Sequence, residues 1–160
     1  MRAIHVSLLL HFIGIGMLFT TLFAGWILEG QYRKAADWTA RAFVLKLLRP
    51  IGLLSPVSIL LLLLSGIGNM TLGLTTYTIV SDTWLTCKLA VFVVAATSGV
   101  FFGIRGAKRS KLVAAMASGS PPAGTEASIK AIDTLQKLFL VVQSALVLII
   151  LTLSIVKPHW

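Results

Sequence analysis

The chain has 160 residues, of which 57% are hydrophobic and only 12% are charged. Soluble domains are about half apolar and about a quarter charged, so this composition excludes an ordinary water-soluble domain. The net charge of +9 does not indicate nucleic acid, because most basic residues lie between apolar segments, where they set topology and contact anionic lipid headgroups. We therefore expect an integral membrane protein whose main partner is the lipid bilayer, with no nucleic-acid partner.

Four continuous apolar segments are long enough to cross a bilayer, which takes ~20 residues of α-helix. Their apolar residues do not alternate with polar ones, which excludes the strands of a membrane barrel. The sequence therefore predicts one all-α integral membrane domain over residues 1–160, an antiparallel bundle of four transmembrane helices. The predicted spans cover about 4–28, 51–74, 84–104 and 131–156.

Two long polar connections separate the spans, at residues 29–50 and 105–130. Residues 35–49 of the first mix basic and apolar side chains, which predicts an interfacial helix or an extension of the second span. Pro50 is expected to start or kink that helix. In the other connection the run SGSPPAG predicts a break at 118–124, after which Thr125 or Ser128 can cap the fourth helix.

The distribution of basic residues predicts the orientation of the bundle. Eleven Lys and Arg residues lie in or beside the connections 29–50 and 105–130, and two lie on the opposite side. Because basic residues stay on the cytoplasmic side, both of these connections are expected in the cytoplasm and both termini outside. The predicted location is the cytoplasmic (inner) membrane of a bacterium, as a multi-pass protein.

Small residues at a spacing of four predict the faces through which the helices pack, because helices in lipid associate where backbones approach closely. The third span has one such stripe and the first has another, formed by Ala95, Gly99, Gly103 and Ala107, and by Gly16, Thr20 and Ala24. Near the middle of the fourth span, Gln143 and Ser144 are expected to form hydrogen bonds between helices.

A layer of polar side chains is predicted in the outer half of the bundle. A rise of about 1.5 Å per residue brings one residue of each helix to a similar depth, namely His11, Asn69, Lys88 and Thr152. Lys88 lies within about 20° of Ala95 around its helix, so it is expected to point inward, unless it snorkels to the outer surface. His11 either forms a hydrogen bond across helices or ligates a metal or haem.

Several motifs together resemble a known group of membrane proteins. They are LLLHFIGIGMLFTTLFAGW with His11, LLRPIGLLSPVSILLLLLSGIGNM, WLTCKLAVF with Trp84 and Lys88, and the ending IVKPHW. Over most of the chain they resemble the HemJ-type membrane protoporphyrinogen oxidases and related CopD-like and uncharacterised families. The resemblance implies a bundle of four or five helices, a first-helix histidine that binds haem b and an essential lysine in a Trp-x-x-x-Lys motif. His11, Trp84 and Lys88 match those positions, whereas the later third-helix histidine of HemJ-type proteins has no counterpart here.

The leading hypothesis is a haem b-binding membrane protein or redox subunit. His11 would be the axial ligand and Lys88 would pair with a haem propionate, with Trp84, Asn69 and Met70 as further candidates around the cofactor. The sixth position would go to Met70, to a small molecule or to His11 of a second copy. One alternative is a non-catalytic accessory subunit of a larger membrane complex. Another is a CopD-like copper-handling protein, although Met17 and Met70 do not form on one helix the cluster of methionines and histidines that copper favours. Whether the protein is an enzyme stays open.

Overall fold

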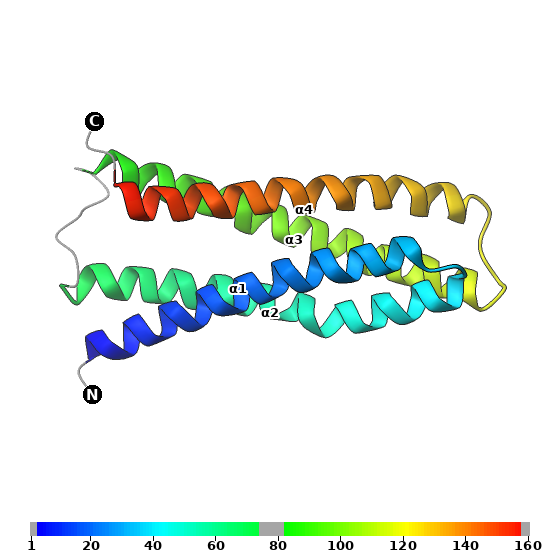
Figure 1. The fold of residues 1–160 in the computed structure, drawn as a ribbon, viewed down its shortest axis with the longest axis horizontal. Coiled ribbons are helices and arrows are strands. Elements are labelled where there is room, and N and C mark those ends of the chain that lie inside the picture. Colours follow the sequence, from blue (N-terminus) through cyan, green and yellow to red (C-terminus); the bar gives the residue numbers. More distant parts are fainter. Residues whose placement is uncertain (1–2, 74–81, 158–160) are drawn as a thin grey trace.

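The computed structural model describes residues 3–73 and 82–157, and nearly all of them are helical. The helices are α1 (Ala3–Lys34), α2 (Trp38–Thr71), α3 (Thr83–Ala117) and α4 (Thr125–Val156). All four are long and apolar enough to cross a membrane, and they run alternately up and down (Figure 1). The predicted all-α membrane bundle is confirmed. The predicted end of the second span at Leu74, and the last three residues of IVKPHW, lie outside the described residues.

The helices are longer than the predicted spans, and the surplus lies mainly at one end of the bundle. Residues 29–34, 38–50, 105–117 and 125–130 were placed in polar connections by the apolar pattern but belong to helices. The predicted extension of the second span is confirmed, and Pro50 lies inside α2. Helices of 32 to 35 residues measure about 48–52 Å, whereas the hydrocarbon core is ~30 Å thick. Hydropathy marks where a helix leaves lipid, and a helix need not end there.

We call this projecting end the basic end, and the opposite end, where α1 begins and α4 ends, the terminal end. At the basic end Asp37 caps α2, because its Oδ1 accepts a hydrogen bond of 2.7 Å from the backbone N–H of Ala40. The predicted cap of α4 was wrong. Gly124 occupies the cap position at φ 75°, and the hydroxyl of Thr125 donates instead to the carbonyl of Pro122.

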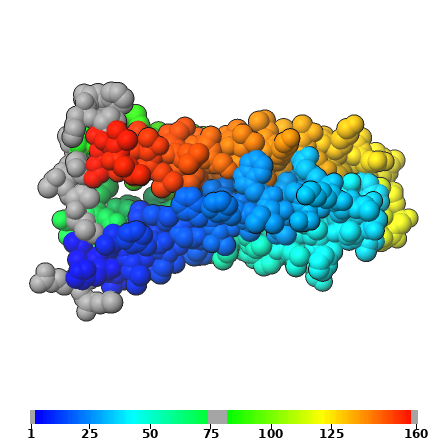
Figure 2. All heavy atoms as spheres, in the orientation of Figure 1, coloured from blue at the N-terminus to red at the C-terminus, as the bar shows by residue number. Residues whose placement is uncertain are grey.

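The four helices form two hairpins joined side by side. α1 packs along α2, and α3 packs along α4, while α2 contacts α3 and α1 approaches α4 at few positions. α1 and α4 separate toward the terminal end (Figure 1), where the space-filling view shows an opening between their atoms (Figure 2). The bundle is therefore closed at the basic end and parted along the seam between α1 and α4.

The most deeply buried side chains gather at the basic end. Tyr32, Leu45, Val113 and Ile129 form a core to which each helix contributes one residue, and none is more than 5% exposed. Apolar burial drives association in water but not between helices that are surrounded by lipid. A tight core is thus expected where the helices project beyond the bilayer, and it is found there.

The close contact between α1 and α2 does not follow the predicted stripe of small residues. Gly14 packs against Leu62, and a Cβ on Gly68 would lie 2.6 Å from Ser7 Oγ. A Cβ on Gly16 would meet no atom within 4 Å, nor would one on Gly99 or Gly103. The predicted seams were therefore wrong except at Ala95, which is 6% exposed. A spacing of four turns about 40° per step around a helix, so such a stripe soon leaves the packed face.

The centre of the bundle is joined by the amide of Gln143, as predicted. Its Oε1 accepts from the Ser98 hydroxyl at 3.1 Å, and its Nε2 donates to the Ala95 carbonyl at 3.3 Å. Ser144 accepts a hydrogen bond of 3.0 Å from Trp26 Nε1. Beside Gln143 lies a mostly apolar cavity of about 20 Å³ that is lined by side chains of all four helices.

Candidate functional site

His11 lies at the contact between α1 and α2, where a hydroxyl orients its ring. Its Nδ1 is 2.9 Å from Ser65 Oγ, and the Ser65 hydroxyl donates to the carbonyl of Leu61 in its own helix. A hydroxyl has one proton. In the tautomer with its proton on Nδ1, the His11 ring donates to Ser65 Oγ, the Ser65 hydroxyl donates to Leu61, and Nε2 keeps a free lone pair. The hydroxyl of Ser7 donates to the Ser65 carbonyl at 3.1 Å, so the two helices are held together at this level.

Lys88 is half-buried on α3 and close enough to interact electrostatically with both His11 and Lys157. It shares a helix face with Ala95, two turns nearer the basic end. Trp84, one turn from Lys88, is only 6% exposed. The Nζ atom of Lys157 lies 6.0 Å from the centroid of the Trp84 ring. The side chains of His11, Lys88 and Lys157 therefore bring positive or titratable groups to one level of the terminal half.

The second helix adds two half-buried candidates at this level, Asn69 and Met70. The Oδ1 atom of Asn69 is buried, and no hydrogen-bond partner for it occurs within 3–73 and 82–157. Thr152 does not join the layer, because it is exposed and its hydroxyl donates to the carbonyl of Leu148 in α4. A threonine satisfies its hydroxyl within its own helix in this way, so depth alone did not place it inward.

A buried ion cluster at the basic end was missed by sequence reasoning. The guanidinium of Arg109 on α3 donates two hydrogen bonds, of 2.8 and 3.1 Å, to the carboxylate of Glu29 on α1. Its Nε lies 2.6 Å from Oδ1 of Asp133 on α4, an electrostatic contact without hydrogen-bond geometry. Arg33 binds the outer side of the same cluster, through Glu29 Oε1 at 3.0 Å and the Asp133 carbonyl at 2.7 Å. Tyr32 covers Arg109, with 3.9 Å between guanidinium carbon and ring centroid.

This cluster connects two helices whose backbones do not approach each other. α1 and α3 stand diagonally across the bundle with no close backbone contact, and the side chain of Arg109, 1% exposed, spans the distance. Charges so deeply buried persist only when they are paired. The two carboxylates, shared between Arg109 and the partly exposed Arg33, meet that condition. The arrangement joins α1, α3 and α4 at the level where the helices leave lipid.

A signal for this cluster was present in the sequence. Glu29 lies on the helix face that also carries Gly25 and Tyr32, which are buried. An acidic residue on the packed face of a basic chain predicts a cationic partner on another helix. Arg109 was instead grouped with the topology signals, because its position next to other basic residues is typical of a membrane boundary.

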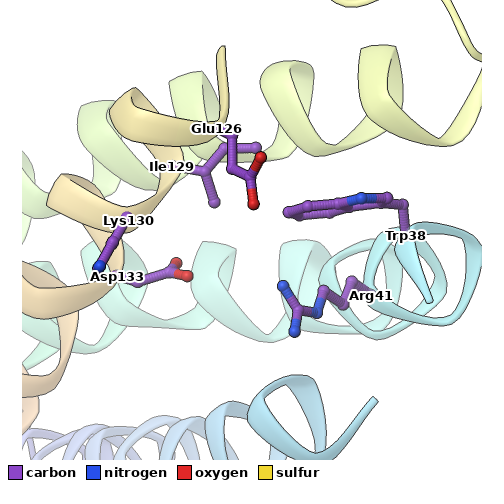
Figure 3. Close-up of a pocket in the computed structure, with 6 residues that line it drawn as sticks. All are labelled: Trp38, Arg41, Glu126, Ile129, Lys130 and Asp133. Atoms are coloured by element: carbon purple, nitrogen blue, oxygen red, sulfur yellow. The ribbon is translucent and has the colours of Figure 1, made fainter. Parts of the chain in front are cut away.

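Beyond the cluster, a cavity of about 180 Å³ opens at the basic end. Its lining comes from the first turns of α2 and α4, two helices that also stand diagonally: Trp38, Arg41, Glu126, Ile129, Lys130 and Asp133. Figure 3 shows Glu126 and Asp133 directing their carboxylates toward the space between α2 and α4, with the Trp38 ring and the Arg41 guanidinium facing them. Arg41 lies 4.7 Å from the centroid of Trp38, and its Nε donates to the Ala35 carbonyl at 3.4 Å.

No three His, Cys, Asp or Glu side chains of the described segments group as a metal site. Comparisons with protein-family models, with curated proteins and with solved structures found no match to this chain. The site candidates therefore rest on two levels of the bundle: the imidazole of His11 with Lys88 in the terminal half, and the ion cluster with its adjoining cavity at the basic end.

Proposed function

We propose that this chain is a haem b-binding protein of a bacterial cytoplasmic membrane, with His11 as an axial ligand. The observation that carries the proposal is the hydrogen bond between His11 Nδ1 and Ser65 Oγ. Histidines that bind iron or other metals donate from one ring nitrogen to a protein acceptor, which orients the other nitrogen's lone pair toward the metal. In the tautomer with its proton on Nδ1, His11 meets this requirement for one axial position.

The surrounding residues fit the peripheral groups of a haem. Lys88 would pair with a propionate, because charge-assisted contacts between ammonium and carboxylate are the strong ones. Trp84 and Asn69 would lie beside it, and Met70 on α2 is the candidate for the second axial position, with a small molecule or His11 of a second copy as the alternatives. A bound haem would supply one-electron chemistry. The chain's own part is to hold the ring of His11 and to place a cation near it.

The opening between α1 and α4 supports the same site (Figure 2). A porphyrin is larger than the central cavity of about 20 Å³, so it would enter from the terminal half, where α1 and α4 part. With the basic end in the cytoplasm, this half of the bundle faces the outer leaflet. The proposed haem would therefore lie nearer the outer face of the membrane.

The test is an absorption spectrum of protein that is produced with ample haem, purified in mild detergent and recorded oxidised and then reduced. We expect a Soret band and a sharp reduced α band that are lost in His11→Ala. The matched control is His5→Ala, because His5 is an exposed histidine of the same helix. Ser65→Ala should weaken haem retention about 10- to 100-fold, as loss of a metal ligand's hydrogen-bond partner does. Wild-type protein without a Soret band refutes the proposal.

A second candidate, the accessory subunit, is favoured by the seam between α1 and α4. Two helices that separate toward the terminal end leave a groove into which a helix of another membrane protein can pack through van der Waals contact. Co-purification of a stoichiometric partner after mild extraction would support this candidate, whereas a homogeneous particle containing this chain alone counts against it. Copper handling through Met17 and Met70 stays a prediction, to be checked by metal analysis.

A further inference from the structure

We propose that the cavity between α2 and α4 at the basic end binds a small zwitterion with the chemistry of an α-amino acid. The cavity measures about 180 Å³, which is ample for several water molecules. This space suits a small ligand such as an amino acid. It lies far from His11, so the inference is independent of the proposed haem site.

The charges around the cavity have both signs: the α4 wall carries Glu126, Asp133 and Lys130, and the α2 wall carries Arg41. Glu126 and Asp133 direct carboxylates into the space from α4, and Arg41 presents its guanidinium from α2 (Figure 3). An ammonium group between two carboxylates and a carboxylate against a guanidinium fork are both favourable, charge-assisted pairings. A ligand with a single charge would satisfy one wall and leave the other unpaired.

The four charged groups of the cavity differ in how far the protein already pairs them. Asp133 is held by Arg109 at 2.6 Å, whereas Glu126 and Lys130 have no ion pair among residues 3–73 and 82–157. Arg41 has none either, and the only hydrogen bond that its guanidinium forms in that part of the chain uses Nε. Both terminal nitrogens of Arg41 therefore remain for a ligand carboxylate, which a guanidinium binds in a two-pronged manner.

The remaining walls suit an apolar side chain. The ring of Trp38 borders the cavity on the α2 side, and Ile129, 2% exposed, closes its inner end. Arg41 forms cation–π contacts with two rings, its guanidinium carbon lying 4.7 Å from the centroid of Trp38 and 5.6 Å from that of Tyr32. The guanidinium is thus already oriented, and little conformational entropy is lost when a ligand binds it.

The depth of the cavity indicates a ligand that comes from water. Lys137 is the last charged residue before the apolar part of α4, and Lys130 lies about 10 Å beyond it along the helix. Each headgroup layer is about 5–8 Å thick. The cavity therefore opens where the headgroup layer meets water, and a free amino acid can reach it there. The serine headgroup of a phospholipid is the other possible source of the zwitterion.

The experiment is isothermal titration calorimetry of the full-length protein in phosphatidylcholine nanodiscs, with L-valine as the probe. Isovalerate lacks only the ammonium group of valine and isobutylamine lacks only its carboxylate. We expect L-valine to bind at least about tenfold more tightly than either analogue, since each lost charge-assisted pairing weakens binding by about that factor. Equal or absent binding of all three ligands overturns the proposal.

Two variants test which side chain binds the ammonium group of the ligand and which binds its carboxylate. Glu126→Gln should weaken L-valine about tenfold and leave isovalerate unchanged, whereas Arg41→Lys should weaken L-valine and isovalerate alike and leave isobutylamine unchanged. The matched control is Arg49→Lys, an exposed arginine of the same helix, which should alter none of them. Glu126 is also exposed, so its variant is expected to fold. Equal losses in Arg49→Lys and Arg41→Lys would refute a defined site.

Nanodiscs that contain phosphatidylserine distinguish the source of the zwitterion. If they leave L-valine binding unchanged, the ligand is the free amino acid. If they abolish it, and if Glu126→Gln reduces this competition by phosphatidylserine, the same cavity holds the serine headgroup. Either result supports the zwitterion site, and a loss of binding that is unaffected by Glu126→Gln argues against it.

Discussion

Removing the guanidinium of Arg109 tests whether the ion cluster holds the basic end together. Arg109→Ala deletes two hydrogen bonds to Glu29 and the contact with Asp133. Glu29 keeps one partner, Arg33, whose side chain is 40% exposed. Breaking a buried ion pair costs about 3–5 kcal/mol, and an exposed pair compensates for only about 0.2–1 kcal/mol of this. We therefore expect a loss of about 3 kcal/mol in the free energy of unfolding.

The measurement is reversible unfolding of the full-length protein in mixed micelles, followed by circular dichroism. The matched control is Arg105→Ala, one turn away on α3, where the guanidinium stacks on Phe101 at 4.4 Å. An exposed cation–π contact contributes about 0.5–1 kcal/mol, so this control should lose no more than that. Arg109→Ala and Arg105→Ala with equal stability would refute our account of the cluster.

A triple variant separates charge from shape. Replacing Glu29 and Asp133 by Leu together with Arg109 by Met removes the ions and fills their volume with apolar atoms. Buried ion pairs replaced in this way often leave stability unchanged or raise it by about 1–4 kcal/mol. The triple variant should therefore recover most of the stability lost in Arg109→Ala. If it is as unstable as the single variant, unpaired carboxylates are not the cause of the loss.

Three smaller changes test other parts of the fold by the same unfolding assay or by hydrogen exchange. Gly68→Ala would place a Cβ 2.6 Å from Ser7 Oγ and should cost about 1–3 kcal/mol; the additional change Ser7→Gly should restore most of it, and no rescue would contradict the clash. Gln143→Leu should cost about 1 kcal/mol through its lost interhelical hydrogen bonds, and an unchanged midpoint would contradict their role. Asp37→Ala should destabilise the first turn of α2 by about 1 kcal/mol, seen as faster amide exchange there, and protection equal to the wild type would contradict the cap.

The transmembrane architecture could be predicted from the sequence because it follows from local properties. A continuous apolar run forms a helix in lipid whatever its neighbours are, since every backbone group must bond within the segment. Gln143 was predicted for a similar reason, because an amide in mid-membrane has few alternatives to a partner on another helix. Both inferences need only one segment and the properties of the bilayer.

The ion cluster could not be predicted in the same way, because it depends on how four helices are placed against one another. Glu29, Arg109 and Asp133 are far apart in the chain, and each lies where a charged residue at the membrane surface is also common. The packing faces were wrongly predicted for a related reason. Gly99 and Gly103 are small, but the size of a residue does not tell which face of α3 meets a neighbouring helix. The helix lengths were missed because α1 to α4 continue into water, where hydropathy no longer marks them.

The pairing of Glu29 with two arginines also bears on how the chain is assembled. Arg33 follows one turn later in the same helix, so Glu29 has a counter-charge as soon as α1 is synthesised, long before Arg109 emerges from the ribosome. The first hairpin can then insert without an isolated buried anion, as amino-terminal units form before later ones. Once the second hairpin arrives, Arg109 joins Arg33 on Glu29 and supplies the buried part of its counter-charge, which holds the two halves together.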